Sequence, residues 1–203
     1  TPEEFHQALQ DEQAVVVDVR NRYESRIGHF EKALLPQADT FREELPLIRE
    51  LLRGKEDKKI LLYCTGGIRC EKASSYLKHA GFKNVNQLHG GIINYAHATR
   101  EKGILPLFKG RNFVFDDRLS EAITDDILTN CDRCGTPCDL YSNCKNEMCN
   151  RLMIHCASCT EKLSGCCTPV CQKIAALPEN DRRVMRKKQK KSPELFRMRM
   201  APS

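Results

Sequence analysis

The sequence lacks any run of about 18 apolar residues, the length that a membrane-spanning helix requires. It also lacks a positively charged start leading into an apolar segment, so we find no secretory signal. We therefore expect a cytoplasmic protein with no membrane partner. The chain has 203 residues and is 40% hydrophobic, which allows one ordinary domain and one smaller one. Because it begins at Thr1 and opens directly on a helix signal, we expect a fragment that lacks upstream sequence.

Most of the chain has no excess of positive charge, because the basic residues that exceed the acidic ones lie near the C-terminus. Residues 181–203 have a net charge of +7, and the remainder sums to −1. Such a run is either a solvated, flexible end or a contact for nucleic-acid phosphates. Its nine basic residues are Arg182, Arg183, Arg186, Lys187, Lys188, Lys190, Lys191, Arg197 and Arg199.

Cysteine is scarce in the first 130 residues, which contain only Cys64 and Cys70. The other ten cysteines lie between Cys131 and Cys171. Because no secretory signal is present, metal binding explains this cluster better than a disulfide scaffold does.

Apolar runs that read as strands alternate with helical patterns over about the first 100 residues, which predicts a parallel α/β domain. Sites in such sheets form at the carboxyl ends of strands, where Asp18, Cys64 and His89 are expected. After Arg100 we expect a linker that packs on this domain, with a short strand near Phe113. The expected elements are a capped helix from Thr1, a strand at 14–17, a polar turn at 21–26, a helix at 43–52, a strand at 60–63, a helix at 70–80, a strand at 85–88 and a helix at 92–98.

The loop Cys64-Thr65-Gly66-Gly67-Ile68-Arg69 lies between a predicted strand and a predicted helix. Glycine permits backbone turns that point successive N–H groups at one centre, and the following helix start and Arg69 add positive charge. This field favours a thiolate on Cys64, or an anion built on it.

The spacing from Cys64 to Arg69 favours sulfur chemistry over phosphate chemistry. Four residues separate the two, whereas cysteine phosphatases have five in a similar loop. The shorter ring suits the terminal sulfur of a persulfide better than a whole phosphate. An ordinary buried cysteine is the alternative, but it leaves the two glycines and the arginine unexplained.

The first 100 residues resemble the rhodanese domain. The resemblance rests on Asp18-Val19-Arg20 with Glu24 and Gly28-His29, on the loop from Cys64 to Arg69, and on Leu88-His89-Gly90-Gly91-Ile92. The longer pattern from Cys64 to Lys72, the segment Phe113-Val114-Phe115-Asp116 and the later Cys-x-x-Cys module resemble the oxygen-dependent tRNA uridine hydroxylases.

This resemblance implies hydroxylation of C5 of the wobble uridine, with tRNA as partner and molecular oxygen as co-substrate. It implies that Cys64 is the required cysteine and that Arg20 and Arg69 are basic active-site residues. It also implies an N-terminal acylphosphatase-like domain in cis, absent from this chain. Because the sequence shows no iron triad, flavin motif or haem signature, we expect a cysteine-centred mechanism.

Two other functions are compatible with the sequence. The chain could be a sulfurtransferase that carries persulfide sulfur on Cys64, taken from thiosulfate or a protein donor. It could also be a non-catalytic binding module stabilised by zinc.

Several residues support the loop in this reading, namely Asp18, Arg20, Thr65, Gly66, Gly67, Ile68 and Cys70. Cys70 either resolves an oxidised Cys64 by forming a disulfide or packs under the loop. Asp18 and Arg20 either form an ion pair that supports the loop or hold a substrate anion. We expect His29 and His89 to be loop scaffolding.

Two Cys-x-x-Cys pairs separated by 21 residues predict a structural zinc site from Cys131, Cys134, Cys156 and Cys159. A second site is expected from Cys144, Cys149, Cys167 and Cys171, with Cys138, Cys166 and His155 as possible substitutes. An iron–sulfur cluster and disulfides are the alternatives. The predicted organisation is a rhodanese-like domain at 1–100, a linker at 101–128, a zinc module at 129–178 and a basic tail at 179–203.

Overall fold

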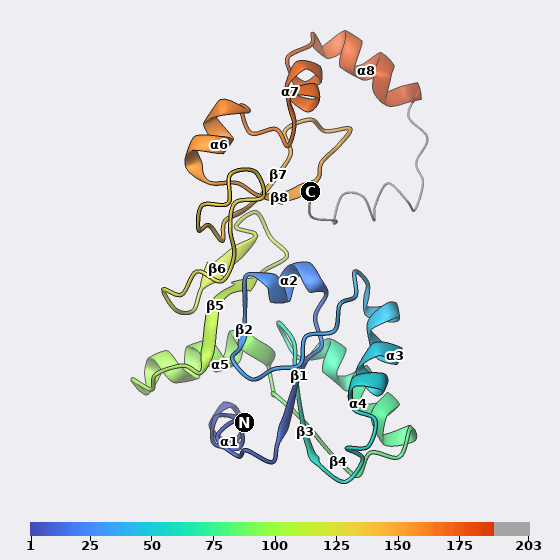
Figure 1. The fold of residues 1–203 in the computed structure, drawn as a ribbon, viewed down its shortest axis with the longest axis vertical. Coiled ribbons are helices and arrows are strands. Elements are labelled where there is room, and N and C mark those ends of the chain that lie inside the picture. The colour runs from blue at the N-terminus through green and yellow to red at the C-terminus, as the bar shows by residue number, and fades with distance from the viewer. Residues whose placement is uncertain (189–203) are drawn as a thin grey trace. The chain divides into compact units, whose positions relative to one another are not determined.

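A computed structural model describes residues 1–188 (Figure 1). The chain divides into two compact units, Thr1–Asp126 and the part that begins at Ile127. Each is described by itself. Within residues 1–188, no helix is long and apolar enough to cross a membrane.

The first unit is built on a parallel sheet with the strand order β1-β3-β4. These strands are β1 (Val15–Asp18), β3 (Lys59–Tyr63) and β4 (Asn84–Gln87). In the register, Asp18 lies opposite Tyr63 and Leu62 lies opposite Gln87. The segments that follow β1 and β3 therefore leave the same edge of the sheet, as the sequence predicts.

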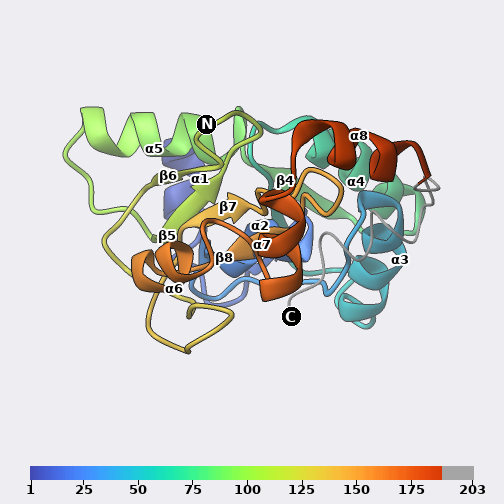
Figure 2. The same cartoon turned by 90° about the horizontal axis from the view of Figure 1, so that it is seen from above.

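Helices cover both faces of this sheet (Figures 1 and 2). On one face, α1 (Pro2–Ala8) and α5 (Gly91–Glu101) bury Phe5 and Tyr95 against the strands. On the other face, α3 (Phe41–Leu51) and α4 (Ile68–His79) contribute Ile48 and Leu77 to a second apolar cluster. The predicted fold class, a parallel sheet flanked by helices, is confirmed.

The segment after residue 107 forms a second sheet of this unit. In it, β2 (Gly28–Phe30), β5 (Phe108–Phe113) and β6 (Ser120–Ala122) are antiparallel, in the order β2-β5-β6. Phe30 packs edge-on against Phe108 at 5.4 Å between ring centroids, and both rings are buried. The short strand expected near Phe113 is thus longer and fully part of the α/β unit.

Two local predictions were wrong. The expected polar turn at 21–26 is a short helix, α2 (Arg22–Arg26), at whose start the Glu24 carboxylate accepts a hydrogen bond from the Asn21 N–H at 3.2 Å. The helix expected from Cys70 begins earlier, at Ile68, because Gly67 caps it in the left-handed region with φ of 95°.

The second unit has short elements and few buried apolar side chains. One of its clusters consists of the buried Cys144, Cys166 and Cys171. Its elements are β7 (Tyr141–Asn143) paired with β8 (Leu152–Ile154), α6 (Ala157–Lys162), α7 (Pro169–Ala175) and α8 (Glu179–Lys188).

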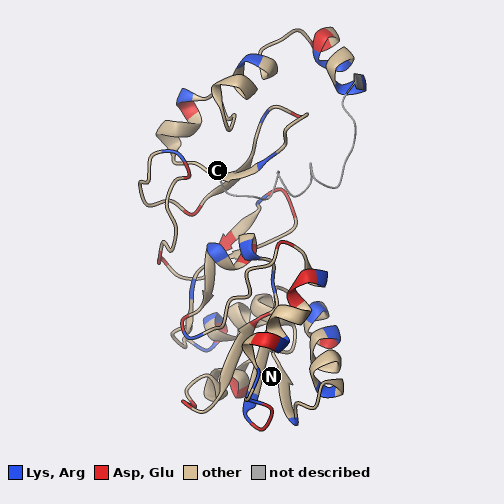
Figure 3. Cartoon of the chain, turned by 45° about the vertical axis from the view of Figure 1, so that its right-hand side comes forward, with Lys and Arg blue, Asp and Glu red and all other residues tan. Residues whose placement is uncertain are grey.

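The basic tail begins within α8, where Lys and Arg gather (Figure 3). Arg182 pairs with Glu179 at 2.6 Å, and Arg186 pairs with Glu147 and Glu179. Part of the positive charge is therefore matched by acidic neighbours. The predicted phosphate contacts of residues 189–203 lie outside the described residues.

Candidate active site

Cys64 directly follows β3 and is buried, with 1% of its surface exposed. Its sulfur accepts a hydrogen bond from the Gly67 N–H at 3.1 Å. The Cys64 and Thr65 carbonyls face the start of α5, where they accept bonds from the Ile92 and Ile93 amides at 3.0 and 3.2 Å. The loop thus directs an N–H group at the sulfur while its carbonyls are bound elsewhere.

Gly91 makes this close contact possible. A side chain there would put Cβ 2.5 Å from the Cys64 carbonyl oxygen and 2.4 Å from that of Thr65. The predicted Gly90-Gly91 turn therefore holds the loop from Cys64 to Arg69, called the nucleophile loop below.

The two histidines that the sequence marks contact backbone carbonyl groups or present their own. The His89 carbonyl accepts a bond from Asn94, and His29 bonds the Ser25 carbonyl through Nδ1. Both contacts are scaffolding contacts.

The environment of Cys64 stabilises a thiolate. The Cys70 thiol donates a hydrogen bond to it, and although burial opposes the charge, Arg69 and the Gly67 amide also favour it, so that the pKa of Cys64 is lowered to about 6. The same hydrogen bond, together with burial, raises the pKa of Cys70 well above its ordinary value. Cys70 therefore stays protonated while Cys64 ionises, which makes Cys64 the nucleophile of the pair.

We expect Cys70→Ala to raise the pKa of Cys64, because it removes the hydrogen bond that most favours the thiolate. The alkylation rate of Cys64 against pH, followed by mass spectrometry, measures this shift. In the native protein the rate should be half-maximal near pH 6, since only the thiolate reacts. Cys70→Ser retains a donor and should shift the curve less. Superimposable curves for all three proteins would disprove the donor role.

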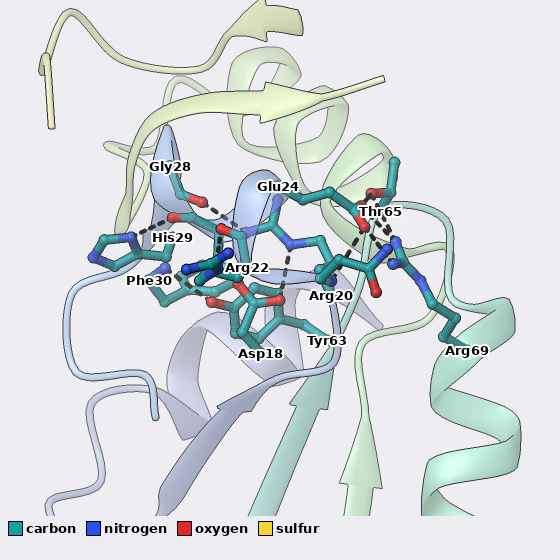
Figure 4. A network of polar contacts seen from close by, with 12 residues as sticks. Asp18, Arg20, Arg22, Glu24, Gly28, His29, Phe30, Tyr63, Thr65 and Arg69 are labelled. Carbon is teal, nitrogen blue, oxygen red and sulfur yellow. Dashed lines mark hydrogen bonds and ion pairs between the residues drawn. The ribbon is translucent and has the colours of Figure 1, made fainter. Parts of the chain in front are cut away.

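Arg69 is held by the buried carboxylate of Glu24, a residue that the sequence marks only through the family resemblance. Its two terminal nitrogens bond the two oxygens of Glu24 at 2.5 and 2.7 Å (Figure 4). Thr65 donates to Glu24 at 3.3 Å and lies 3.4 Å from Arg69 Nη2. The Arg69 charge is therefore partly balanced by Glu24, and the pair fixes the loop through Thr65.

Asp18 and Arg20 form a second ion pair, in which both side chains are fully buried. Arg20 Nε and Nη2 donate to Asp18 at 2.8 and 2.6 Å, and Nη2 also donates to the Gly28 carbonyl (Figure 4). The guanidinium lies near the rings of Tyr63 and Phe108. This geometry favours the interpretation that the pair supports the loop over one in which it contacts substrate.

Glu44 was not recognised in the sequence. Its side chain extends from α3, is fully buried, and both carboxylate oxygens have no hydrogen-bond partner among the described residues. Burial raises its pKa to about 9, and the charges of Asp18 and Glu24 act in the same direction. Glu44 is therefore protonated at neutral pH beside the two ion pairs.

Eight of the ten late cysteines gather into the two sets that the spacing predicts. One set is Cys131, Cys134, Cys156 and Cys159, the other is Cys144, Cys149, Cys167 and Cys171, and the sulfurs of each set lie within 4.8 Å of one another. Either set could hold a metal ion. Across residues 1–188, Cys138, Cys166 and His155 belong to neither group.

The geometry of both sets fits tetrahedral coordination. Four sulfurs at about 2.3 Å from a zinc ion would lie roughly 3.8 Å apart. The sulfur–sulfur distances of Cys134–Cys156, Cys149–Cys167 and Cys167–Cys171 are all 3.6 Å. The Cys167 amide also donates to Cys144 Sγ at 3.3 Å, a contact of the kind that orients a metal ligand.

Two family models match parts of the chain. The model of the rhodanese-like domain family matches residues 1–98, and that of the rhodanase C-terminal family matches residues 109–172. Residues 1–98 are therefore a rhodanese-like domain. The Cys64 loop accordingly lies in that domain.

Curated relatives of the chain are named tRNA uridine(34) hydroxylase. The protein of Leptospira interrogans is 59% identical over 91% of the chain, and that of an Enterobacter species is 49% identical over 95%. The protein of Photorhabdus laumondii is 47% identical over 96%. The chain spans 50%, 55% and 55% of these three relatives, about half of their length.

Proposed function

We propose that this chain takes part in oxygen-dependent hydroxylation of the wobble uridine of tRNA at C5, with Cys64 as its catalytic residue. The observation that carries the proposal is the joint presence of the activated Cys64 and of 47–59% identity to proteins named tRNA uridine(34) hydroxylase. The proposal concerns the whole protein, including any further domain in cis. Its substrate implies a cytoplasmic location.

The loop residues have distinct parts in this proposal. Cys64 supplies a thiolate near neutral pH, and the Gly67 amide and the Cys70 thiol hold it in place. Arg69, paired with Glu24, fixes the loop through Thr65. Asp18 and Arg20 keep the end of β1 in register with this arrangement. Molecular oxygen is the proposed co-substrate.

The two cysteine sets are proposed as structural zinc sites. All four ligands of each are protein thiols, so neither leaves an open position for catalysis. The unit that contains them, with the basic residues of the tail, is proposed to contact tRNA phosphates.

Sulfur transfer is the second candidate function, because the Cys64 loop lies in a rhodanese-like domain. In that reaction the Cys64 thiolate attacks the outer sulfur of thiosulfate. A Cys64 persulfide forms and sulfite leaves with the bonding electron pair. Both candidate functions require Cys64, so the products must separate them.

Nucleoside analysis of cellular tRNA tests the proposal. Cells that lack the protein should lose 5-hydroxyuridine and the nucleosides derived from it. The full-length protein should restore them, whereas Cys64→Ala at matched abundance should not. Loss of a thiolated nucleoside instead would favour sulfur transfer. Unchanged nucleosides would contradict both enzymatic functions and leave a binding module.

A further inference from the structure

Phe115 is an aromatic side chain that the fold holds at its surface. It follows β5 and is 67% exposed. Its ring lies against Phe113, at 5.2 Å between centroids and 74° between planes. Phe113 is buried and packs edge-on against Tyr23 at 5.1 Å. The exposed Phe115 ring is thus supported by the buried Phe113 ring, although Phe115 itself buries little apolar surface.

The Phe115 ring borders the nucleophile loop. The guanidinium carbon of Arg69 lies 5.9 Å from the ring centroid, and Arg69 Nη2 lies 3.4 Å from Oγ1 of Thr65, the residue after Cys64. Ile68, next to Arg69 in the chain, is 80% exposed. An exposed aromatic ring therefore lies beside Arg69 of the Cys64 loop, and the residue before Arg69, Ile68, is an exposed apolar one.

This surface matches the chemistry of an unstacked base in RNA. Single-stranded bases stack on aromatic side chains, and nearby cations and helix starts favour the phosphates that accompany them. The N-terminal end of the twelve-residue helix α4 contributes positive potential there, and Arg69 contributes the part of its charge that Glu24 does not balance. An apolar protein surface would gain nothing from these charges.

We propose that Phe115 stacks on the uracil ring of the nucleotide that reacts at Cys64. The inference rests on the proposed function and names the residue that holds the base. Phe115 and Arg69 would position the ring from one side, while the loop presents the sulfur.

Binding of two RNA probes to the full-length protein tests this inference. One probe is an anticodon stem-loop with uridine at the wobble position, and the other has an abasic nucleotide there. Phe115→Ala should weaken binding of the uridine probe by about 5- to 150-fold, the range that stacking of one base provides, and should leave the abasic probe unaffected. Phe115→Trp should retain affinity, and Phe115→Leu should behave like alanine. Leu105→Ala, at a residue that is 81% exposed, is the matched control and should change neither affinity.

Three results would overturn the inference, the last of them being normal binding by Phe115→Ala. Equal losses with both probes would show that Phe115 does not contact the uracil ring. Full affinity with leucine would show that only an apolar surface is needed, as a protein partner would require. Failure of the proposed function is a separate result. It would be seen if the native protein did not restore 5-hydroxyuridine to the tRNA of cells that lack the protein. If the native protein restores hydroxyuridine but Phe115→Ala binds normally, only the stacking inference fails.

Discussion

Removing metal from the purified protein is expected to unfold the unit that begins at Ile127 and to leave the rhodanese-like unit folded. The second unit has short elements and buries cysteines where a larger domain would bury an apolar core. Structural zinc contributes roughly 10–16 kcal/mol of apparent binding free energy at pH 7, which is more than most domains have as total stability. Amide hydrogen exchange before and after chelation measures the effect in each unit. Loss of protection should be confined to the second unit.

Single cysteine variants sharpen this test. Cys159→Ser removes one ligand of the first set and should lower the metal content and unfold the elements around it. Cys138→Ser is the matched control, because Cys138 is also buried but lies outside both sets. Elemental analysis should find zinc, whereas visible absorbance would indicate an iron–sulfur cluster. Retained protection of β7 and β8 after complete metal removal would contradict a structural role.

Glu44→Gln is expected to stabilise the rhodanese-like unit by about 2–4 kcal/mol at pH 8 and to have little effect near pH 5. The pKa of Glu44 is about 9 in the folded protein and 4.5 as its ordinary value. Between these values the unfolded chain releases a proton that the folded chain retains. The free energy of unfolding therefore falls as pH rises, by about 1.4 kcal/mol per pH unit from this group. Glutamine cannot ionise, so the variant should lose this slope.

Urea unfolding at several pH values measures the difference. Glu50→Gln is the control on the same helix, because Glu50 is exposed and pairs with Arg53 at the surface. Its effect should be close to zero at every pH. Parallel pH profiles for the native protein and Glu44→Gln would show that Glu44 is ionised in the folded protein as it is in the unfolded chain, so that its pKa is not raised.

The sequence was sufficient for the sheet and its main helices because their patterns are local. The valines at 15–17 and the apolar residues at 60–62 mark two buried strands, and the structure pairs them in parallel. The helix at 22–26 was missed because five residues are too few to show a helical period. Its only signal was an Asn at position 21 followed three residues later by Glu, which is a capping pair.

The site could be predicted in part. Glycines and the spacing to Arg69 mark the Cys64 loop, and the paired cysteines mark both metal-ligand sets, because these features are close in sequence. The bidentate pairing of Arg69 with Glu24 joins residues 45 positions apart, so tertiary packing alone selects it. Glu44 carries no signal at all, since a carboxylate in an amphipathic helix normally faces water.

The antiparallel pairing of β2 with β5 has a practical consequence for anyone who shortens this protein. The rhodanese-like match ends at residue 98, yet Phe108, one of the rings beside Arg20, lies beyond it. A protein cut at the match boundary would lose the neighbour strand of β2 and open the buried Asp18–Arg20 pair to water. Asp126, where the first compact unit ends, is therefore the safer place to separate the two halves.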